Sequence, residues 1–305
     1  MTSAIFEDAP VLPRWLDNEL PFRRRVARVD GRRIHFVDEG AGTPVLLMHG
    51  NPTWCFLWRK VIARLREHEG LRLIAPDLLG LGLSDKLPNP ADHRLDVHAR
   101  AIARLTEVLE LEDAIVVAQD WGGPIGVGAA MLRSEGGKPF LRGLVLGNTA
   151  VLEPKRPLRT TSFHRFSHLP IASDLAFRGL LFPVPVMHRV QGDRRSIGSR
   201  EKAAYAWPLR RLGDRAAPLG LARMVPDREE HPSVPFLDRL GGFVRAYRGP
   251  AALVWGERDP ILGRALARHR EALPQATVEI TSAGHFLQEE VPDELARAVR
   301  TVAGM

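Results

Sequence analysis

The chain has 305 residues, of which 45% are hydrophobic and 26% are charged. This length suffices for a large core, built as one domain with an insertion or as two domains, and the composition excludes a mainly disordered chain. The formal net charge of +7 raises the question of nucleic-acid binding. The positive residues, however, are nearly all arginines scattered along the chain, and no basic stripe interleaves with aromatic residues. We therefore expect no nucleic-acid partner.

Hydropathy and cysteine content favour a cytoplasmic protein. No run of about 18 apolar residues lacks charges and turn residues, so we expect no membrane-spanning helix. The first fifteen residues do not have the basic and apolar regions of a secretory signal. Cys55 is the only cysteine, which excludes an intramolecular disulfide and a cysteine-rich metal site. We expect a cytoplasmic protein with no membrane partner, metal or cofactor, and the sequence leaves a homo-oligomer open.

The first half of the chain alternates predicted strands and helices. Asp30-Gly31 lies between two segments that favour strands, which is a strong signal for a hairpin. The next segment, PVLLMHG, has the apolar run of a buried strand. In chain order, the predicted elements are strands at 23–28 and 33–39, a buried strand at 44–50, a helix at 57–67, a strand at 71–77 and a helix at 93–110.

The second half continues the alternation on both sides of one long interruption. The apolar run AIVVAQ at 114–119 leads directly into Asp120 and a helix of small residues that ends near 133. The sequence also predicts buried strands at 143–148, 250–257 and 277–284, and helices at 261–273 and 292–303. Alternating strands and helices indicate an α/β protein with a mostly parallel, twisted sheet flanked by helices.

Residues 151–226 interrupt this alternation. They contain many arginines and several prolines, no clear buried strand, and helical segments near 171–182 and 200–212. We interpret them as a helical cap inserted between two strands of the sheet. The core would then comprise residues 1–150 and 227–305.

Asp120 stands at the centre of a small-x-acid-x-small pattern, AQDWG, between a predicted strand and a predicted helix. The nucleophile elbow of the α/β-hydrolase fold has this form, usually with serine at its centre. Small flanking residues suit the sharp turn, and the helix N-terminus directs N–H groups toward the nucleophile. Alone, the pattern fits a helix N-cap equally well, because Asp also favours that position.

Asp259 and His285 favour the catalytic interpretation. Asp259 follows the predicted strand that ends near Trp255, and His285 follows the next predicted strand. Each alone has an ordinary explanation, as a turn former before Pro260 and as a loop histidine. Together with Asp120 they have the chain order of nucleophile, acid and histidine in this fold, each at the carboxyl end of a strand. We therefore predict a catalytic triad of Asp120, His285 and Asp259.

The motif HGNPTW at 49–54 follows a buried strand and completes the predicted site. In this fold, the loop after that strand supplies one oxyanion-hole N–H, and the residue after the nucleophile supplies the other. These donors would be the backbone N–H groups of Asn51 and Trp121.

A carboxylate nucleophile differs from serine in its chemistry. It can displace a leaving group from saturated carbon and form an alkyl ester. Water activated by His285 can then attack the carbonyl of that ester, which belongs to Asp120, while Asp259 orients the imidazole. The oxyanion hole would serve this second step.

The sequence resembles the haloalkane dehalogenases in five motifs: HGNPTW, DLLGLGLSD, QDWGG, WGERDPI and SAGHFLQEE. The resemblance covers nearly the whole chain and is strongest at 35–130 and 250–295. It implies hydrolysis of a haloalkane to alcohol, halide and a proton, with Asp120 as nucleophile, His285 as base and Asp259 as acid. The implied partners are a halogenated small molecule and a halide ion.

The resemblance also implies that the indole of Trp121 and the side-chain amide of Asn51 bind the halide. The alternative for Trp121 is an aromatic that packs beside the elbow. One branch of the family has a Glu acid where this chain has Asn148, and another takes a halide donor from a cap tryptophan. Trp207 is the only tryptophan of the predicted cap, and we expect it to line the pocket or pack. The chain is similar to the branch with an Asp-His-Asp triad and Asn and Trp donors.

Three other functions fit parts of this pattern. Epoxide hydrolases share the fold and the Asp nucleophile but use two cap tyrosines, and only Tyr205 falls inside the predicted cap. Coelenterazine-type luciferases, which are oxidoreductases, resemble the dehalogenases closely in sequence, although hydrolysis is the commoner activity on this pattern. A binding protein without catalysis is also conceivable on this fold, but the intact triad argues against it.

Overall fold

The computed structural model of the protein describes residues 5–158 and 161–305. In this part of the chain, nine strands form one sheet in the order β1-β2-β3-β5-β4-β6-β7-β8-β9. The strands are β1 (Phe6–Asp8), β2 (Arg24–Val29), β3 (Arg32–Gly40), β4 (Gly42–Met48), β5 (Gly70–Pro76), β6 (Ala114–Asp120), β7 (Leu141–Thr149), β8 (Ala251–Gly256) and β9 (Thr277–Thr281). The pairs β1–β2, β2–β3 and β3–β5 are antiparallel, and the remaining pairs are parallel.

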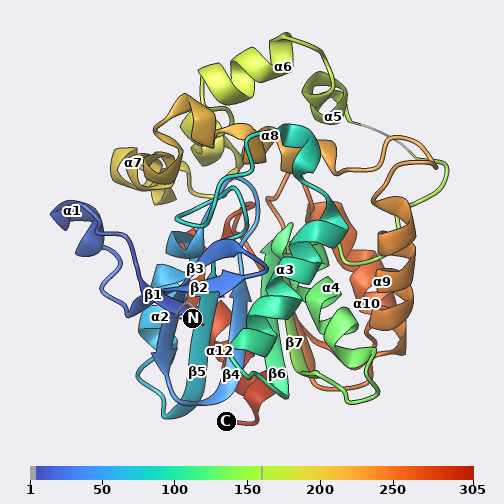
Figure 1. Ribbon diagram of the computed structural model, residues 1–305. Coiled ribbons are helices and arrows are strands. Elements are labelled where there is room, and N and C mark those ends of the chain that lie inside the picture. The colour runs from blue at the N-terminus through green and yellow to red at the C-terminus, as the bar shows by residue number, and fades with distance from the viewer. Residues whose placement is uncertain (1–4, 159–160) are drawn as a thin grey trace.

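Helices cover both faces of this sheet (Figure 1). One face is covered by α3 (Leu95–Val108), α4 (Gly122–Ser134), α9 (Val234–Ala246) and α10 (Leu266–Ala272). The other is covered by α2 (Arg59–Leu65) and α12 (Pro292–Ala303), with the short α11 (Leu287–Glu290) beside them. A further short helix, α1 (Arg14–Asp17), precedes β2. This arrangement agrees with the α/β class and the two-sided cover predicted from the sequence.

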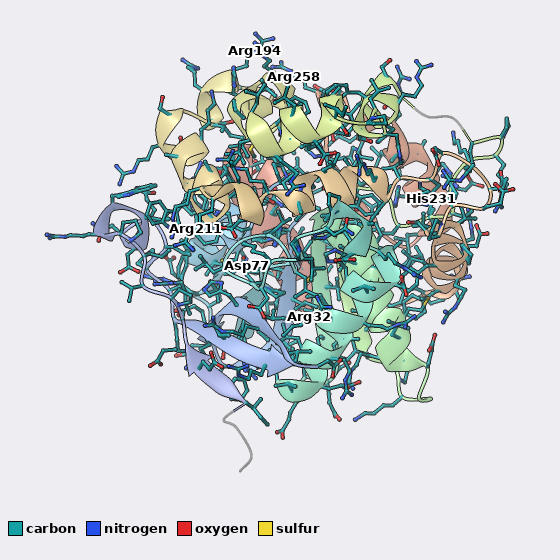
Figure 2. All side chains as sticks on the ribbon, turned by 45° about the horizontal axis from the view of Figure 1, so that its top comes forward. Arg32, Asp77, Arg194, Arg211, His231 and Arg258 are labelled. Atoms are coloured by element: carbon teal, nitrogen blue, oxygen red, sulfur yellow. The ribbon has the colours of Figure 1, made fainter. Side chains whose placement is uncertain are left out.

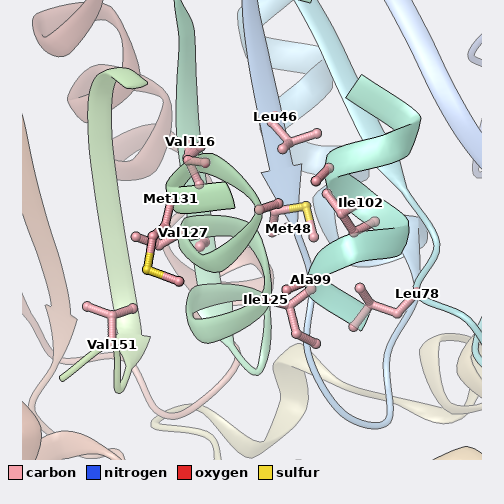
Figure 3. Packing of buried hydrophobic residues seen from close by; sticks show 14 of the residues in the cluster. Leu46, Met48, Leu78, Ala99, Ile102, Val116, Ile125, Val127, Met131 and Val151 are labelled. Atoms are coloured by element: carbon pink, nitrogen blue, oxygen red, sulfur yellow. The ribbon is translucent and has the colours of Figure 1, made fainter. Parts of the chain in front are cut away.

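The core between the sheet and α3 and α4 is apolar (Figure 3). Met48 of β4 and Val116 of β6 face Ile102 of α3 and Ile125 of α4, and all four are at most 1% exposed. Full burial of one such side chain contributes about 1.5–3 kcal/mol. This core therefore fixes the carboxyl ends of both strands: Asn51 follows β4 closely, and Asp120 is the last residue of β6.

Two strand predictions had different outcomes. The hairpin predicted around Asp30-Gly31 is confirmed: β2 and β3 pair with Val29 opposite Arg32, and both turn residues have positive φ. A strand is present within the predicted range 277–284, but the prediction that it is buried is wrong. The strand β9 lies at the edge of the sheet, and its side chains are exposed or half-buried, because no strand pairs with its outer side among the described residues.

The segment between β7 and β8 forms several short helices at one end of the sheet (Figure 1). They include α5 (Ser162–Ser167), α6 (Ala172–Asp174), α7 (Ser199–Ala206) and α8 (Ala216–Arg223). The helical segment predicted near 171–182 is broken into α6 and a π-turn at 175–179, and α8 and α9 were not predicted.

Apart from buried Arg59, the described arginines are spread over the outer surface (Figure 2). Exposed Arg32, Arg194, Arg211 and Arg258 come from separate parts of the chain, whereas Asp77 is buried in the interior. Among the described residues, no helix has both the length and the apolar character needed to cross a membrane.

Candidate active site

Asp120 lies at the end of β6, in the sharp turn that leads into α4. Its φ of 51° falls in the left-handed region, which is uncommon for a residue other than glycine and is typical of a strained functional turn. A Cβ at Gly122 would overlap the carbonyl oxygen of Met48, so only glycine allows α4 to begin this close to β4. The hydroxyl of Thr149 donates to the carbonyl oxygen of Asp120 at 2.6 Å and fixes the turn.

Asp259 and His285, which follow β8 and β9, meet Asp120 of β6 at the carboxyl edge of the sheet. Nδ1 of His285 lies 3.0 Å from Oδ2 of Asp259, and its Nε2 lies 3.6 Å from Oδ2 of Asp120. The first distance is a hydrogen bond and the second is too long for one. Because Asp259 accepts from Nδ1, the neutral ring presents its free lone pair at Nε2, toward Asp120. The structure thus brings together the three residues of the predicted triad.

The triad is shielded from solvent. His285 is 1% exposed and Asp259 is 6% exposed. Burial lowers the pKa of His285, but the negative charge of Asp259, helped by Asp120, outweighs burial and raises this pKa to about 10. Loss of the charge on Asp120 would therefore lower the pKa of His285.

The two carboxylate oxygens of Asp120 have different surroundings. The backbone N–H of Asn51 donates to Oδ1 at 2.8 Å, while Oδ2 faces His285. A side chain at Gly50 would overlap the carboxylate of Asp120, so that the loop after β4 can approach only with glycine there. Of the two predicted oxyanion-hole donors, the N–H of Asn51 contacts the Asp120 carboxylate, whereas the N–H of Trp121 makes no hydrogen bond to it among the described residues.

A cavity of about 700 Å³ opens in front of Asp120. Its floor includes Asn51, Asp120, Trp121 and His285, and its walls are mainly apolar side chains from the core and from the segment between β7 and β8. Among the described residues, the indole N–H of Trp121 has no acceptor, and one hydrogen of the Asn51 amide is used by the carbonyl oxygen of Pro218 at 2.9 Å. Asn51 and Trp121 thus both line the cavity, and each keeps a side-chain N–H without an acceptor among the described residues.

Comparison with known proteins places the chain in a family. The model of the alpha/beta hydrolase fold family matches residues 43–292. The chain is 34% identical to haloalkane dehalogenase 2 of Mycobacterium tuberculosis over 92% of this chain and 94% of that protein. It is 32% identical to a haloalkane dehalogenase of Mycobacterium marinum over 88% and 87%. The structure of haloalkane dehalogenase DbeA from Bradyrhizobium elkani superposes with a TM-score of 0.81 at 26% identity, over 92% and 97% of the two chains. The chain belongs to the haloalkane dehalogenase family.

Two residues at the site of this family member were not predicted as part of it. Gln119 directs its amide nitrogen to Nε2 of His285 at 3.2 Å and to the carbonyl oxygen of His285 at 3.1 Å. Asn148 joins the loops that carry Asp259 and His285, since its amide donates to the carbonyl oxygen of Gly284 at 2.7 Å and accepts from the N–H of Gly256 at 2.9 Å. The only sequence signal for Gln119 is its place in the QDWGG motif, directly before Asp120.

Trp207 lies apart from the cavity of this dehalogenase family member. Trp207 packs edge-on against Trp15, with ring centroids 6.3 Å apart, and beneath the guanidinium of Arg210. It is not among the residues that line the cavity in the described parts of the chain. Of the two roles considered for Trp207, the structure favours packing.

Both tyrosines also point elsewhere. The hydroxyl of Tyr205 donates to buried Glu289 at 2.6 Å, and that of Tyr247 donates to the carbonyl oxygens of Arg142 and Pro250. Within the described residues, neither tyrosine lines the cavity. The epoxide hydrolase alternative therefore finds no tyrosine donors at this site.

Buried His35, Cys55 and Asp77 are the described group whose ligand atoms are close enough to hold a metal, within 4.8 Å of one another. The oxygens of Asp77 already accept from the N–H groups of Cys55 at 2.7 Å and Leu83 at 2.7 Å, and Nδ1 of His35 lies 2.8 Å away. A carboxylate engaged in three hydrogen bonds is a poor metal ligand. This arrangement is that of a structural anchor, which holds β3 against the loop after β5.

Proposed function

We propose that this protein hydrolyses haloalkanes to an alcohol, a halide ion and a proton, through an alkyl ester on Asp120. The observation that carries the proposal is the difference between the two oxygens of Asp120. Oδ1 accepts the N–H of Asn51, whereas Oδ2 has no hydrogen-bond partner among the described residues, and Asp120 lines the cavity. Such a carboxylate has one oxygen free to attack and the other already held by a donor.

In the first step, Oδ2 of Asp120 attacks the carbon that bears the halogen. A carbon–oxygen bond forms, the carbon–halogen bond breaks, and its electron pair leaves with the halide. The indole N–H of Trp121 and the amide of Asn51 would stabilise that ion, because fixed donors are effective in an apolar cavity. Both side chains reach the cavity floor.

In the second step, Nε2 of His285 takes a proton from water, whose oxygen attacks Cγ of Asp120. Negative charge then develops on Oδ1, where the N–H of Asn51 already donates. Asp259 stabilises the imidazolium. When the intermediate collapses, the Cγ–Oδ2 bond breaks and the alkoxide takes the proton of the imidazolium to leave as the alcohol. The carboxyl group left on Asp120 then loses its proton, which regenerates the carboxylate and the neutral imidazole.

The proposal extends to a helical cap, to the cellular location and to the oligomeric state of the enzyme. Residues 151–226 would form a helical cap on a core of 1–150 and 227–305, since side chains between 161 and 226 line the cavity opposite Asp120. Cytoplasmic location and homo-oligomerisation remain predictions, to be checked by cell fractionation and by light scattering.

Bromide release tests the proposal directly. The purified protein should release bromide from 1-bromobutane or 1,2-dibromoethane, and Asp120→Asn should not. After treatment with 1-bromobutane, His285→Phe should keep the butyl group on Asp120. Mass spectrometry of the intact protein should show the added mass. Absence of bromide across a panel of haloalkanes, together with turnover of styrene oxide, would replace the proposal by an epoxide hydrolase. Light emission from coelenterazine would replace it by a luciferase.

A further inference from the structure

The side-chain amide of Gln119 contacts both the ring and the backbone carbonyl of the catalytic histidine, His285. Gln119 is the residue of β6 before Asp120 and is 1% exposed. Its Nε2 lies 3.1 Å from the carbonyl oxygen of His285 and 3.2 Å from the ring Nε2. Because a carbonyl oxygen can only accept, the amide must present its nitrogen to this side. The reversed amide would set two oxygens against each other.

This orientation leaves one polar atom unsatisfied. Oε1 of Gln119 is buried and has no hydrogen-bond partner in the described parts of the chain. Buried acceptors without a partner are rare because their desolvation is not repaid, and each one requires an explanation. The explanation here is that this orientation keeps the two contacts of the amide nitrogen with His285, and leaves the amide oxygen without a partner.

The contact distinguishes the two forms of the ring. With Nδ1 of His285 bonded to Asp259, a neutral ring accepts at Nε2, and the N–H of Gln119 suits it. A protonated ring would instead place its own N–H against that of Gln119. The titratable groups that face the ring are Asp259 and Asp120, and both favour the protonated ring. Glu290 reaches only the backbone N–H of Gly284 in that loop.

We propose that Gln119 is a positioning residue, which holds the imidazole of His285 and favours the ring with an unprotonated Nε2. This inference rests on the proposed function, because only the hydrolysis of an ester on Asp120 needs that form of the ring. Once the ester has formed, Asp120 carries no charge. Asp259 is then the only one of the two carboxylates that still favours the protonated ring, against the preference of Gln119 for an unprotonated Nε2. The water molecule that enters then donates its own hydrogen bond to Nε2 of His285, in place of the amide N–H of Gln119.

Two substitutions at Gln119 separate positioning from packing. Gln119→Glu keeps the shape but replaces the N–H donor by a negative charge, and Gln119→Met keeps the volume without a donor. In single-turnover experiments with 1-bromobutane, we expect ester formation within about twofold of the parent and ester hydrolysis slowed about tenfold or more at pH 7.5. In Gln119→Glu the midpoint of the pH profile of hydrolysis should rise by about one unit or more, so that activity recovers at alkaline pH.

Gln191→Met is the matched control. Gln191 is also buried, and its amide holds the backbone of Phe286 next to the histidine without touching the ring. Loosening of the loop in Gln191→Met should leave the midpoint unchanged. The inference is overturned if Gln119→Glu keeps the parent midpoint, or if Gln191→Met shifts it equally.

Failure of the proposed function would be seen separately, as the absence of bromide release by the parent protein. In that case, the ring contact is tested without substrate. Nitrogen-15 resonances of His285 should titrate at higher pH in Gln119→Glu than in the parent, and identical titrations would refute the contact.

Discussion

The backbone N–H of Asn51 donates to Oδ1 of Asp120 at 2.8 Å, and the other oxygen of that carboxylate faces His285. The assignment of the attacking atom to Oδ2 predicts the fate of each oxygen. After attack by Oδ2, water adds to Cγ, so the alcohol takes its oxygen from Asp120 and the enzyme takes the oxygen of water. A single turnover in ¹⁸O-water should yield unlabelled alcohol and a labelled peptide containing Asp120. Labelled alcohol in the first turnover would mean direct attack of water on carbon.

The two candidate halide donors outside the elbow can be compared directly. Asn51→Ala should lower kcat/KM for 1-bromobutane about tenfold or more, because it removes an amide on the cavity floor. Trp207→Ala should change it about twofold at most, because Trp207 packs against Trp15 away from the cavity. Bromide release is the measurement. A larger loss in Trp207→Ala would move the second halide donor into the cap.

The parts of the fold that the sequence predicted correctly have local signals. The Asp30-Gly31 turn and the apolar run before Asp120 each specify their structure through neighbouring residues. The burial of β9 was predicted wrongly because the residues of a short strand do not reveal whether that strand has one neighbour or two. Its position at the sheet edge depends on the order of all the strands.

The same distinction holds for the site. Asp120, Asp259 and His285 could be predicted because each follows a recognisable strand in a fixed order. Gln119 could not, because its contact with His285 joins residues 166 positions apart and depends on which face of β6 the side chain occupies. Residue type alone does not separate a positioning glutamine from one that packs.

Replacing Asp259 should affect both activity and the pH dependence of stability. Asp259→Asn should lower kcat about a thousandfold, because the amide no longer fixes the tautomer or stabilises the imidazolium. The pKa of His285 is raised to about 10 in the folded protein, above the ordinary value of 6.5. Its charge therefore stabilises the fold fully below pH 6.5, and this contribution is lost as the pH rises to about 10.

Thermal unfolding across this range measures the effect. The Tm of the parent should fall relative to that of Asp259→Asn between pH 6.5 and 10, because the variant has lost the main source of the raised pKa. A Tm difference that does not depend on pH would show that Asp259 stabilises the fold without a charged His285.

A buried ion pair behind the site should be important for stability. The carboxylate of Glu289 in α11 is fully buried and accepts from Arg59 at 2.6 and 2.9 Å, from Lys60 at 2.9 Å and from the hydroxyl of Tyr205 in α7 at 2.6 Å. Glu289→Gln removes the main counter-charge of the buried Arg59 guanidinium, leaving Glu201 at 4.0 Å, and should lower the free energy of unfolding by about 3 kcal/mol. Asp293→Asn is the matched control, because Asp293 of α12 also pairs with an arginine of α2, Arg64, but is mostly exposed. It should cost less than about 1 kcal/mol in urea unfolding. Equal losses in the two variants would show that burial does not set the strength of these pairs.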